Sequence, residues 1–246
     1  GDLVQHGLGF REFAASDGTG VRVLDPGDLP VTVYMHALGG TGFTAWGGLL
    51  VTGALKDGEN VFVSAAAGAV GSVAIQIARI KGCYTIGSAG SEEKCAWLKD
   101  ELGVDAVINY RDGVLRKSLK AAAPKGIDVY FENVGGEHLD AALPRMNLGG
   151  RIPVCGMISA YNTPGARSTG VTTLSNMIYT RVRMEGFVVP DFEDQRGQFE
   201  SDMRGWLASG EMRYRETIMD GIERAPDALI GLMSGENIGK MLVKLD

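Results

Sequence analysis

Short apolar runs alternate with segments of helical periodicity from about residue 60 onward. Residues 60–65 (NVFVSA) form an apolar run of the length of a buried strand. Apolar side chains then recur through residues 69–81 at the spacing of one helical face, at Val70, Val73, Ala74, Ile77 and Ile80. The alternation repeats along the chain, and this is typical of βαβ units that build a parallel sheet.

The same reading predicts five further strands and four further helices. The strands are expected at residues 84–88, 106–109, 128–133, 151–155 and 184–189. The helices are expected at residues 91–102, 114–123, 137–146 and 195–209, with Ser91 as an N-cap and Pro124 as a stop. We therefore predict an α/β fold of the Rossmann type, a doubly wound parallel sheet of six strands, over residues 30–212.

The two ends of the chain do not follow this alternation. Residues 3–4 and 21–24 are β-like, and residues 213–246 suggest a strand at 216–222, a helix after Pro226 and a strand at 240–245. We expect residues 1–29 and 213–246 to fold together as a second, smaller and β-rich unit.

Composition narrows the classes of partner. The 246 residues carry a net charge of −6, which gives no electrostatic case for nucleic acid. No apolar run approaches the roughly 20 residues that span a bilayer, and the first residues do not resemble a signal peptide. Three scattered cysteines and three scattered histidines predict neither a disulfide framework nor a metal site. We expect a cytoplasmic protein without membrane or nucleic-acid partners.

A small-residue turn stands where the first predicted strand meets its helix. Gly68, Ala69, Val70 and Gly71 allow a sharp turn whose free N–H groups can meet a pyrophosphate. The match to GxGxxG is partial, because Ala66 stands at the first glycine position. Taken alone, this turn also suits tight packing of strand and helix, but its place in a series of βαβ units favours a dinucleotide.

The end of the second strand favours NADP(H) over NAD(H). An NAD-binding domain usually carries an acidic residue there for the ribose diol. Residues 87–91 (GSAGS) contain none, and Lys94 follows on the helix. A lysine ammonium and serine hydroxyls can bind the 2′-phosphate by hydrogen bonds, whereas a carboxylate would repel it. Lys94 as a merely solvated helix residue is the alternative.

Two more turns follow predicted strands. Residues 133–136 (NVGG) and 155–159 (CGMIS) are candidate cofactor contacts, because ligands of open α/β sheets bind beyond the carboxyl ends of strands. Each also reads as an ordinary turn, and Cys155 reads as a small packed residue. The stretch 159–170, rich in Pro, Gly, Ser and Thr, is predicted to be a functional loop.

Several blocks together resemble one family, the zinc-independent medium-chain dehydrogenase/reductases. Within it the chain is most similar to the group of prostaglandin reductases, leukotriene hydroxydehydrogenases and alkenal double-bond reductases, which includes curcumin-reductase-like enzymes. The resemblance rests on seven segments in the same order: SAAAGAVG (64–71), KGC (81–83), NY (109–110), YFENVGG (130–136), CGMISAYN (155–162), IYTRVRMEGFVV (178–189) and GENIGKMLVK (235–244).

The resemblance implies NADPH-dependent reduction of the carbon–carbon double bond in α,β-unsaturated ketones and aldehydes. It implies that Lys94 meets the 2′-phosphate and Tyr110 the adenine ribose. It also implies a larger set of residues along the cofactor: Gly68, Ala69, Val70, Gly71, Asn133, Cys155, Gly156, Ile158, Ser159, Tyr161, Phe187, Val188, Val189 and Asn237. Tyr179 is the implied catalytic residue, as a hydroxyl donor to the developing enolate or through the nicotinamide ribose. A tyrosine that only packs its ring is the alternative.

Family members carry a longer N-terminal GroES-like catalytic domain, of which residues 1–26 resemble only the last strands. We therefore expect most of that domain to be absent from this chain, and the exposed apolar surface to favour a homodimer. Two alternatives stay open: a quinone oxidoreductase of the same superfamily, and an NADP-binding fragment without catalysis.

Overall fold

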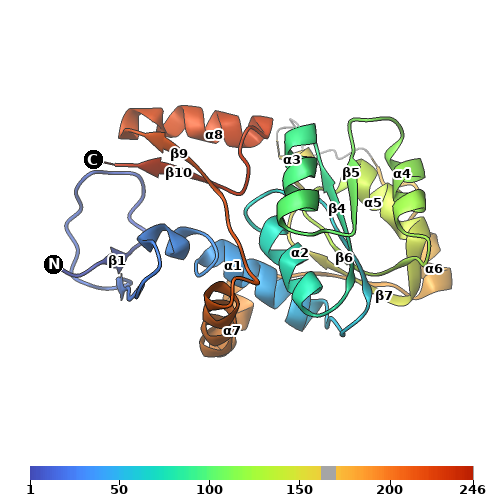
Figure 1. The fold of residues 1–246 in the computed structure, drawn as a ribbon, viewed down its shortest axis with the longest axis horizontal. Helices are drawn as coiled ribbons and strands as arrows, with labels where there is room; N and C mark the ends of the chain where they lie inside the picture. The colour runs from blue at the N-terminus through green and yellow to red at the C-terminus, as the bar shows by residue number, and fades with distance from the viewer. Residues whose placement is uncertain (162–169, 246) are drawn as a thin grey trace.

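The computed structural model describes residues 1–161 and 170–245. Its centre is a parallel sheet of six strands in the order β5-β4-β3-β6-β7-β8 (Figure 1). The strands are β3 (Asn60–Val63), β4 (Tyr84–Ala89), β5 (Ala106–Asn109), β6 (Ile127–Phe131), β7 (Met146–Val154) and β8 (Arg183–Gly186). From β3 the chain adds β4 and β5 on one side of the sheet, and it then returns to add β6, β7 and β8 on the other side of β3. The strand order therefore reverses between the neighbours β3 and β6. The predicted doubly wound sheet is confirmed.

Alternation along the strands gives the sheet two buried faces. Val61 and Val63 of β3 point into one core, whereas Phe62 between them points into the other and stacks on Tyr130. The first core is covered by α1 (Gly40–Trp46), α2 (Gly71–Ile80), α3 (Glu92–Ala96) with its continuation Trp97–Glu101, and α7 (Arg196–Ala208). The second is covered by α4 (Leu115–Ala122), α5 (Gly136–Ala142) and α6 (Asn176–Thr180).

Predicted and observed element bounds agree closely in the middle of the chain. The strand predicted at 106–109 is observed as β5, and the Ser91 side chain caps α3 by accepting a hydrogen bond from the Lys94 amide at 3.3 Å. The helix predicted at 137–146 ends earlier: a short 3-10 turn, Leu143–Arg145, follows α5, and β7 begins at Met146. Within the described residues, no helix has the length and apolarity needed to cross a bilayer.

A glycine-rich helical segment before β3 was not predicted. The 3-10 turn Val31–Met35, α1 and the π-helical turn Gly47–Thr52 pack against the first core. A Cβ at Gly47 would lie 2.1 Å from the ring of Phe192, and one at Gly48 would lie 2.2 Å from that of Phe187. These glycines make room for aromatic rings, and their low helix propensity weakens the helical pattern in the sequence.

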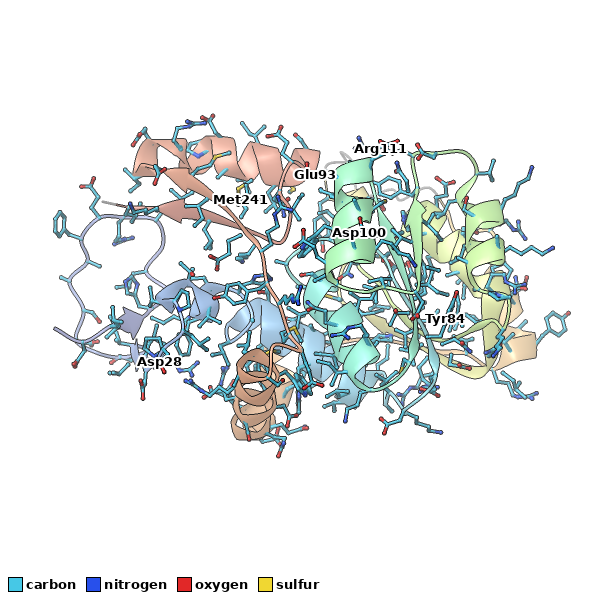
Figure 2. All side chains as sticks on the ribbon, viewed as in Figure 1. Asp28, Tyr84, Glu93, Asp100, Arg111 and Met241 are labelled. Atoms are coloured by element: carbon cyan, nitrogen blue, oxygen red, sulfur yellow. The ribbon has the colours of Figure 1, made fainter. Side chains whose placement is uncertain are left out.

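The two ends lie on one side of the Rossmann-type domain, as expected, but as two separate small sheets (Figure 1). Strands β1 (Val4–Gln5) and β2 (Arg22–Val23) pair antiparallel, whereas β9 (Glu216–Asp220) and β10 (Lys240–Lys244) pair parallel under α8 (Ala225–Ser234). An apolar groove of about 720 Å³ lies along the C-terminal unit, lined by Leu229, Met241 and Val243 among others, with Phe10 and Met35 from the N-terminal part of the chain. Figure 2 labels Met241 on the inner strand of the C-terminal unit.

Candidate functional site

The glycine turn presents free amide groups at the start of α2. Among the described residues, the amides of Val70 and Gly71 donate no hydrogen bond, whereas the Ala69 amide belongs to the parallel bridge between Gly68 and Gly239. A Cβ at Gly71 would lie only 2.3 Å from the carbonyl oxygen of Ala65, and Ala65 itself has a φ of +49°. The turn is therefore tight at its backbone, and it exposes two donors at the positive end of a helix dipole, which suits a pyrophosphate.

His36 and the C-terminal segment hold this turn from outside the sheet. Burial lowers the pKa of His36 to about 4, so the neutral imidazole donates from Nε2 to the Ala69 carbonyl oxygen at 3.0 Å. Gly239 donates its amide to the Ala67 carbonyl oxygen at 2.8 Å. Asn237 is buried nearby and bonds the Gly239 carbonyl oxygen at 2.7 Å. Asn237 thus lies beside the turn but directs its amide into its own segment.

Lys94 and Tyr110 lie together beyond the carboxyl ends of β4 and β5. The ring of Tyr110 covers Gly90, where a Cβ would lie 2.5 Å from the hydroxyl oxygen. Burial, and then the nearby Arg111 guanidinium, lower the pKa of Lys94. The Lys94 ammonium donates to the Gly235 carbonyl oxygen at 2.5 Å. Figure 2 shows Arg111 at this end of the sheet, above α3. Two cations lie close together here, an arrangement that suits a phosphate.

A buried polar cluster joins the ends of β3 and β6, where the topology reverses. The Asn133 side-chain amide donates to the Ser64 carbonyl oxygen at 2.7 Å, and the Asn133 backbone amide donates to the Ser64 hydroxyl at 2.9 Å. Ser64 in turn donates to the Glu132 carboxylate at 3.0 Å. Asn133 is therefore fixed at the position where ligands of such sheets bind.

The turn after β7 packs on the turn after β6. Ser159 donates its amide at 3.1 Å and its hydroxyl at 2.5 Å to the Val134 carbonyl oxygen, and the Ile158 amide donates to Asn133. The Tyr161 hydroxyl accepts from the Met157 amide at 3.3 Å and covers Gly156. Of the predicted loop 159–170, residues 162–169 lie outside the described part of the chain.

Cys155 begins this turn and is no nucleophile at neutral pH. Burial, and then the Glu132 carboxylate, raise the pKa of its thiol to about 12. Farther along the same edge, the ring of Phe187 packs between Phe131 and Phe192, whereas Val188 is 61% exposed and Val189 is half-buried. The predicted residues after β7 and β8 thus reach the carboxyl edge of the sheet.

Tyr179 is the predicted residue that does not join the others within one chain. It lies on α6, which packs on β7 and on the turn Leu143–Arg145 and ends three residues before β8 begins. This places α6 at the amino end of the sheet (Figure 1), away from the turns described above. The Tyr179 side chain is 78% exposed and the neighbouring Ile178 is 73% exposed. The ring is therefore not a packed core residue.

Sequence reasoning missed three residues of this site: His36, Ser64 and Glu132. All three are fully buried polar side chains at strand or helix ends. An acidic residue that follows an apolar strand in YFEN was the available signal for Glu132. No group of three His, Cys, Asp or Glu side chains among the described residues is placed to hold a metal ion.

Comparison with known proteins identifies relatives over the whole chain. The family model of zinc-binding dehydrogenases matches residues 69–207. The putative NADP-dependent oxidoreductase YfmJ of Bacillus subtilis is 45% identical, covering 100% of this chain and 73% of that protein. The NADP(+)-dependent 2-alkenal reductase of Nicotiana tabacum is 44% identical over 99% of this chain and 71% of its own length. The crystal structure of CurA from Vibrio vulnificus in complex with NADPH superimposes with a TM-score of 0.93 at 42% identity, covering 100% of this chain and 74% of that one.

Proposed function

The chain belongs to the zinc-binding dehydrogenase family, and from this premise we propose that it is an NADP-dependent reductase of α,β-unsaturated ketones and aldehydes. One observation carries the proposal: the free amides of Val70 and Gly71 at the start of α2 occur together with the cation Lys94 after β4, a strand that ends without an acidic residue. The 2-alkenal reductase and the NADPH-bound CurA support the cofactor and the substrate class.

The residues present fit NADP(H), and each part has a distinct task. The Val70 and Gly71 amides would bind the pyrophosphate, and Lys94 with Tyr110 would hold the phosphorylated adenosine half. Asn133 and the turn after β7 would orient the other half. The bound cofactor supplies a hydride for the β-carbon of the enone. The protein contributes orientation, and a hydroxyl donor would stabilise the negative charge that develops on the carbonyl oxygen.

We assign residues 30–212 to the cofactor domain. Residues 1–29 and 213–246 are assigned to a GroES-like unit on the substrate side. The apolar groove between β10, α8 and Phe10 supports this division, because residues of both terminal segments line it. The three cysteines are free thiols, which supports the cytosol as the proposed compartment.

We further propose a homodimer in which Tyr179 serves the partner's site. Strand β8 is an edge strand, and all four of its residues are exposed. Antiparallel pairing of two β8 strands about a two-fold axis sets the amino end of one sheet beside the carboxyl end of the other. The α6 helix of one copy then approaches the partner's turns after β7 and β8, with its exposed Tyr179.

Mixed dimers test this assignment. Tyr179→Phe should lower the turnover of a linear enone by about a hundredfold, the low end of the loss for a missing oxyanion donor. Lys94→Ala should lower turnover at low NADPH. Co-expression of the two variant chains should restore activity well above either alone, because one site of each mixed dimer keeps both residues. Activity no higher than the average of the parents would place Tyr179 in its own chain's site or outside catalysis.

The substrate class is tested by steady-state turnover. With NADPH, a linear enone should be reduced at least tenfold more efficiently than a benzoquinone of similar size. The reverse order would identify a quinone oxidoreductase. NADPH binding without oxidation by either substrate would identify a cofactor-binding fragment without catalysis.

A further inference from the structure

Glu132 occupies an unusual position for a carboxylate. It follows β6 beside the end of β3, where the strand order of the sheet reverses, and its side chain is fully buried. A buried carboxylate needs hydrogen-bond donors. Those of Glu132 all meet Oε1, because Oε2 is buried without a partner among the described residues. Its Oε1 accepts three hydrogen bonds, from the Ser64 hydroxyl at 3.0 Å and from the Val134 and Gly135 amides at 2.6 and 2.9 Å.

The backbone of Glu132 binds the next strand as well. Its carbonyl oxygen accepts from the Cys155 amide at 2.9 Å and from the Gly156 amide at 3.1 Å. One residue therefore links the ends of three strands: β3 through Ser64, β6 through its own turn, and β7 through the turn that begins at Cys155.

The side-chain contacts fix a turn that has little stability of its own. Gly135 and Gly136 have φ values of +74° and +52°, and their conformational freedom disfavours any single turn geometry. The Glu132 carboxylate selects one geometry by accepting two successive amides of this turn. In this geometry the Val134 carbonyl oxygen accepts a hydrogen bond from Ser159. The Glu132 carboxylate therefore also fixes the position of the turn after β7.

We propose that Glu132 is a positioning residue for the nicotinamide half of the cofactor. It acts as a hydrogen-bond acceptor that sets Asn133 and the turn after β7, not as a charge that meets the cofactor. The adenosine half, which the ends of β4 and β5 would hold, is independent of it. This inference rests on the proposed cofactor role of these turns.

The test separates the two halves of the cofactor by equilibrium binding. In Glu132→Ala, the Kd for NADPH should rise at least tenfold, whereas the Kd for adenosine 2′,5′-bisphosphate should stay within twofold. Glu132→Gln keeps an acceptor oxygen and should stay within threefold for both. Where Glu132→Ala does not fold, Ser64→Ala should raise the NADPH Kd threefold or more, again without a change for the bisphosphate.

Asp128 supplies a matched control on the same strand. Its carboxylate links β3 and β7 to β6 at the amino ends, by accepting from Asn60 at 2.8 Å and from Asn147 at 2.7 Å. Asp128→Ala should lower the melting temperature without changing either Kd. Equal weakening of NADPH and the bisphosphate in the Glu132 or Ser64 variants, or no change in either, would overturn the positioning role. Failure of wild-type protein to bind NADPH would instead refute the proposed function.

Discussion

Replacing Lys94 by alanine should weaken NADPH binding ten- to hundredfold and leave NADH binding within twofold. A hydrogen bond to a charged group contributes about 1.5–3 kcal/mol, which is about a ten- to hundredfold change in Kd. The Lys94 ammonium is half-buried, and within residues 1–161 and 170–245 its one hydrogen-bond partner is the Gly235 carbonyl oxygen, so it can meet an added phosphate. Fluorescence titration with each cofactor measures both constants.

Lys99→Ala is the matched control for this prediction. Lys99 follows on the same helical segment, but its ammonium bonds the Asp105 carbonyl oxygen at 2.8 Å, at the amino end of β5. Its removal should change neither Kd. Unchanged NADPH affinity in Lys94→Ala would refute the assignment of the 2′-phosphate, and an equal loss for NADH would show a general effect on the fold.

Gly71→Ala should abolish measurable NADPH binding, a loss of about a hundredfold or more. The added Cβ would lie 2.3 Å from the Ala65 carbonyl oxygen and 2.9 Å from the Ala66 Cα. Both are backbone atoms, so the turn must open. Its free amides would then no longer point together at the pyrophosphate. The same shift should lower the free energy of unfolding by about 1–3 kcal/mol, as overpacking does. Calorimetry of unfolding and of NADPH binding measures the two effects.

Gly205→Ala is the corresponding control. Gly205 lies inside α7, and a Cβ there would meet no heavy atom within 4 Å. Alanine should raise stability by about 0.5–1 kcal/mol and leave NADPH binding unchanged. Normal NADPH binding by Gly71→Ala would mean that the turn at α2 does not hold the pyrophosphate.

The sheet could be predicted because its signals are local. The inner strands β3, β4 and β6 are short apolar runs buried on both faces, and the helices that cover them show apolar faces. The cofactor turns follow from the same reasoning, because topology alone brings the ends of parallel strands to one edge. The proposed role of Lys94 was predictable because no acidic residue stands at the end of β4, where an NAD-binding domain usually carries one.

The rest of the molecule depends on contacts that no local pattern encodes. The helices around Gly47 and Gly48 owe their form to Phe187 and Phe192, which are more than a hundred residues away. Glu132 gains its role only when Ser64 and the turn after β7 surround it. Tyr179 shows the opposite case: family resemblance predicts its role, whereas the single chain places it at the far end of the sheet.

Transfer of deuterium tests the central claim most directly. The protein is incubated with NADPH that carries deuterium at the transferable position of the nicotinamide, together with a linear α,β-unsaturated ketone. We predict the saturated ketone as product, with one deuterium on the β-carbon. An allylic alcohol with deuterium on the former carbonyl carbon, or NADPH oxidation without deuterium in any product, would contradict the proposed reduction of the carbon–carbon double bond.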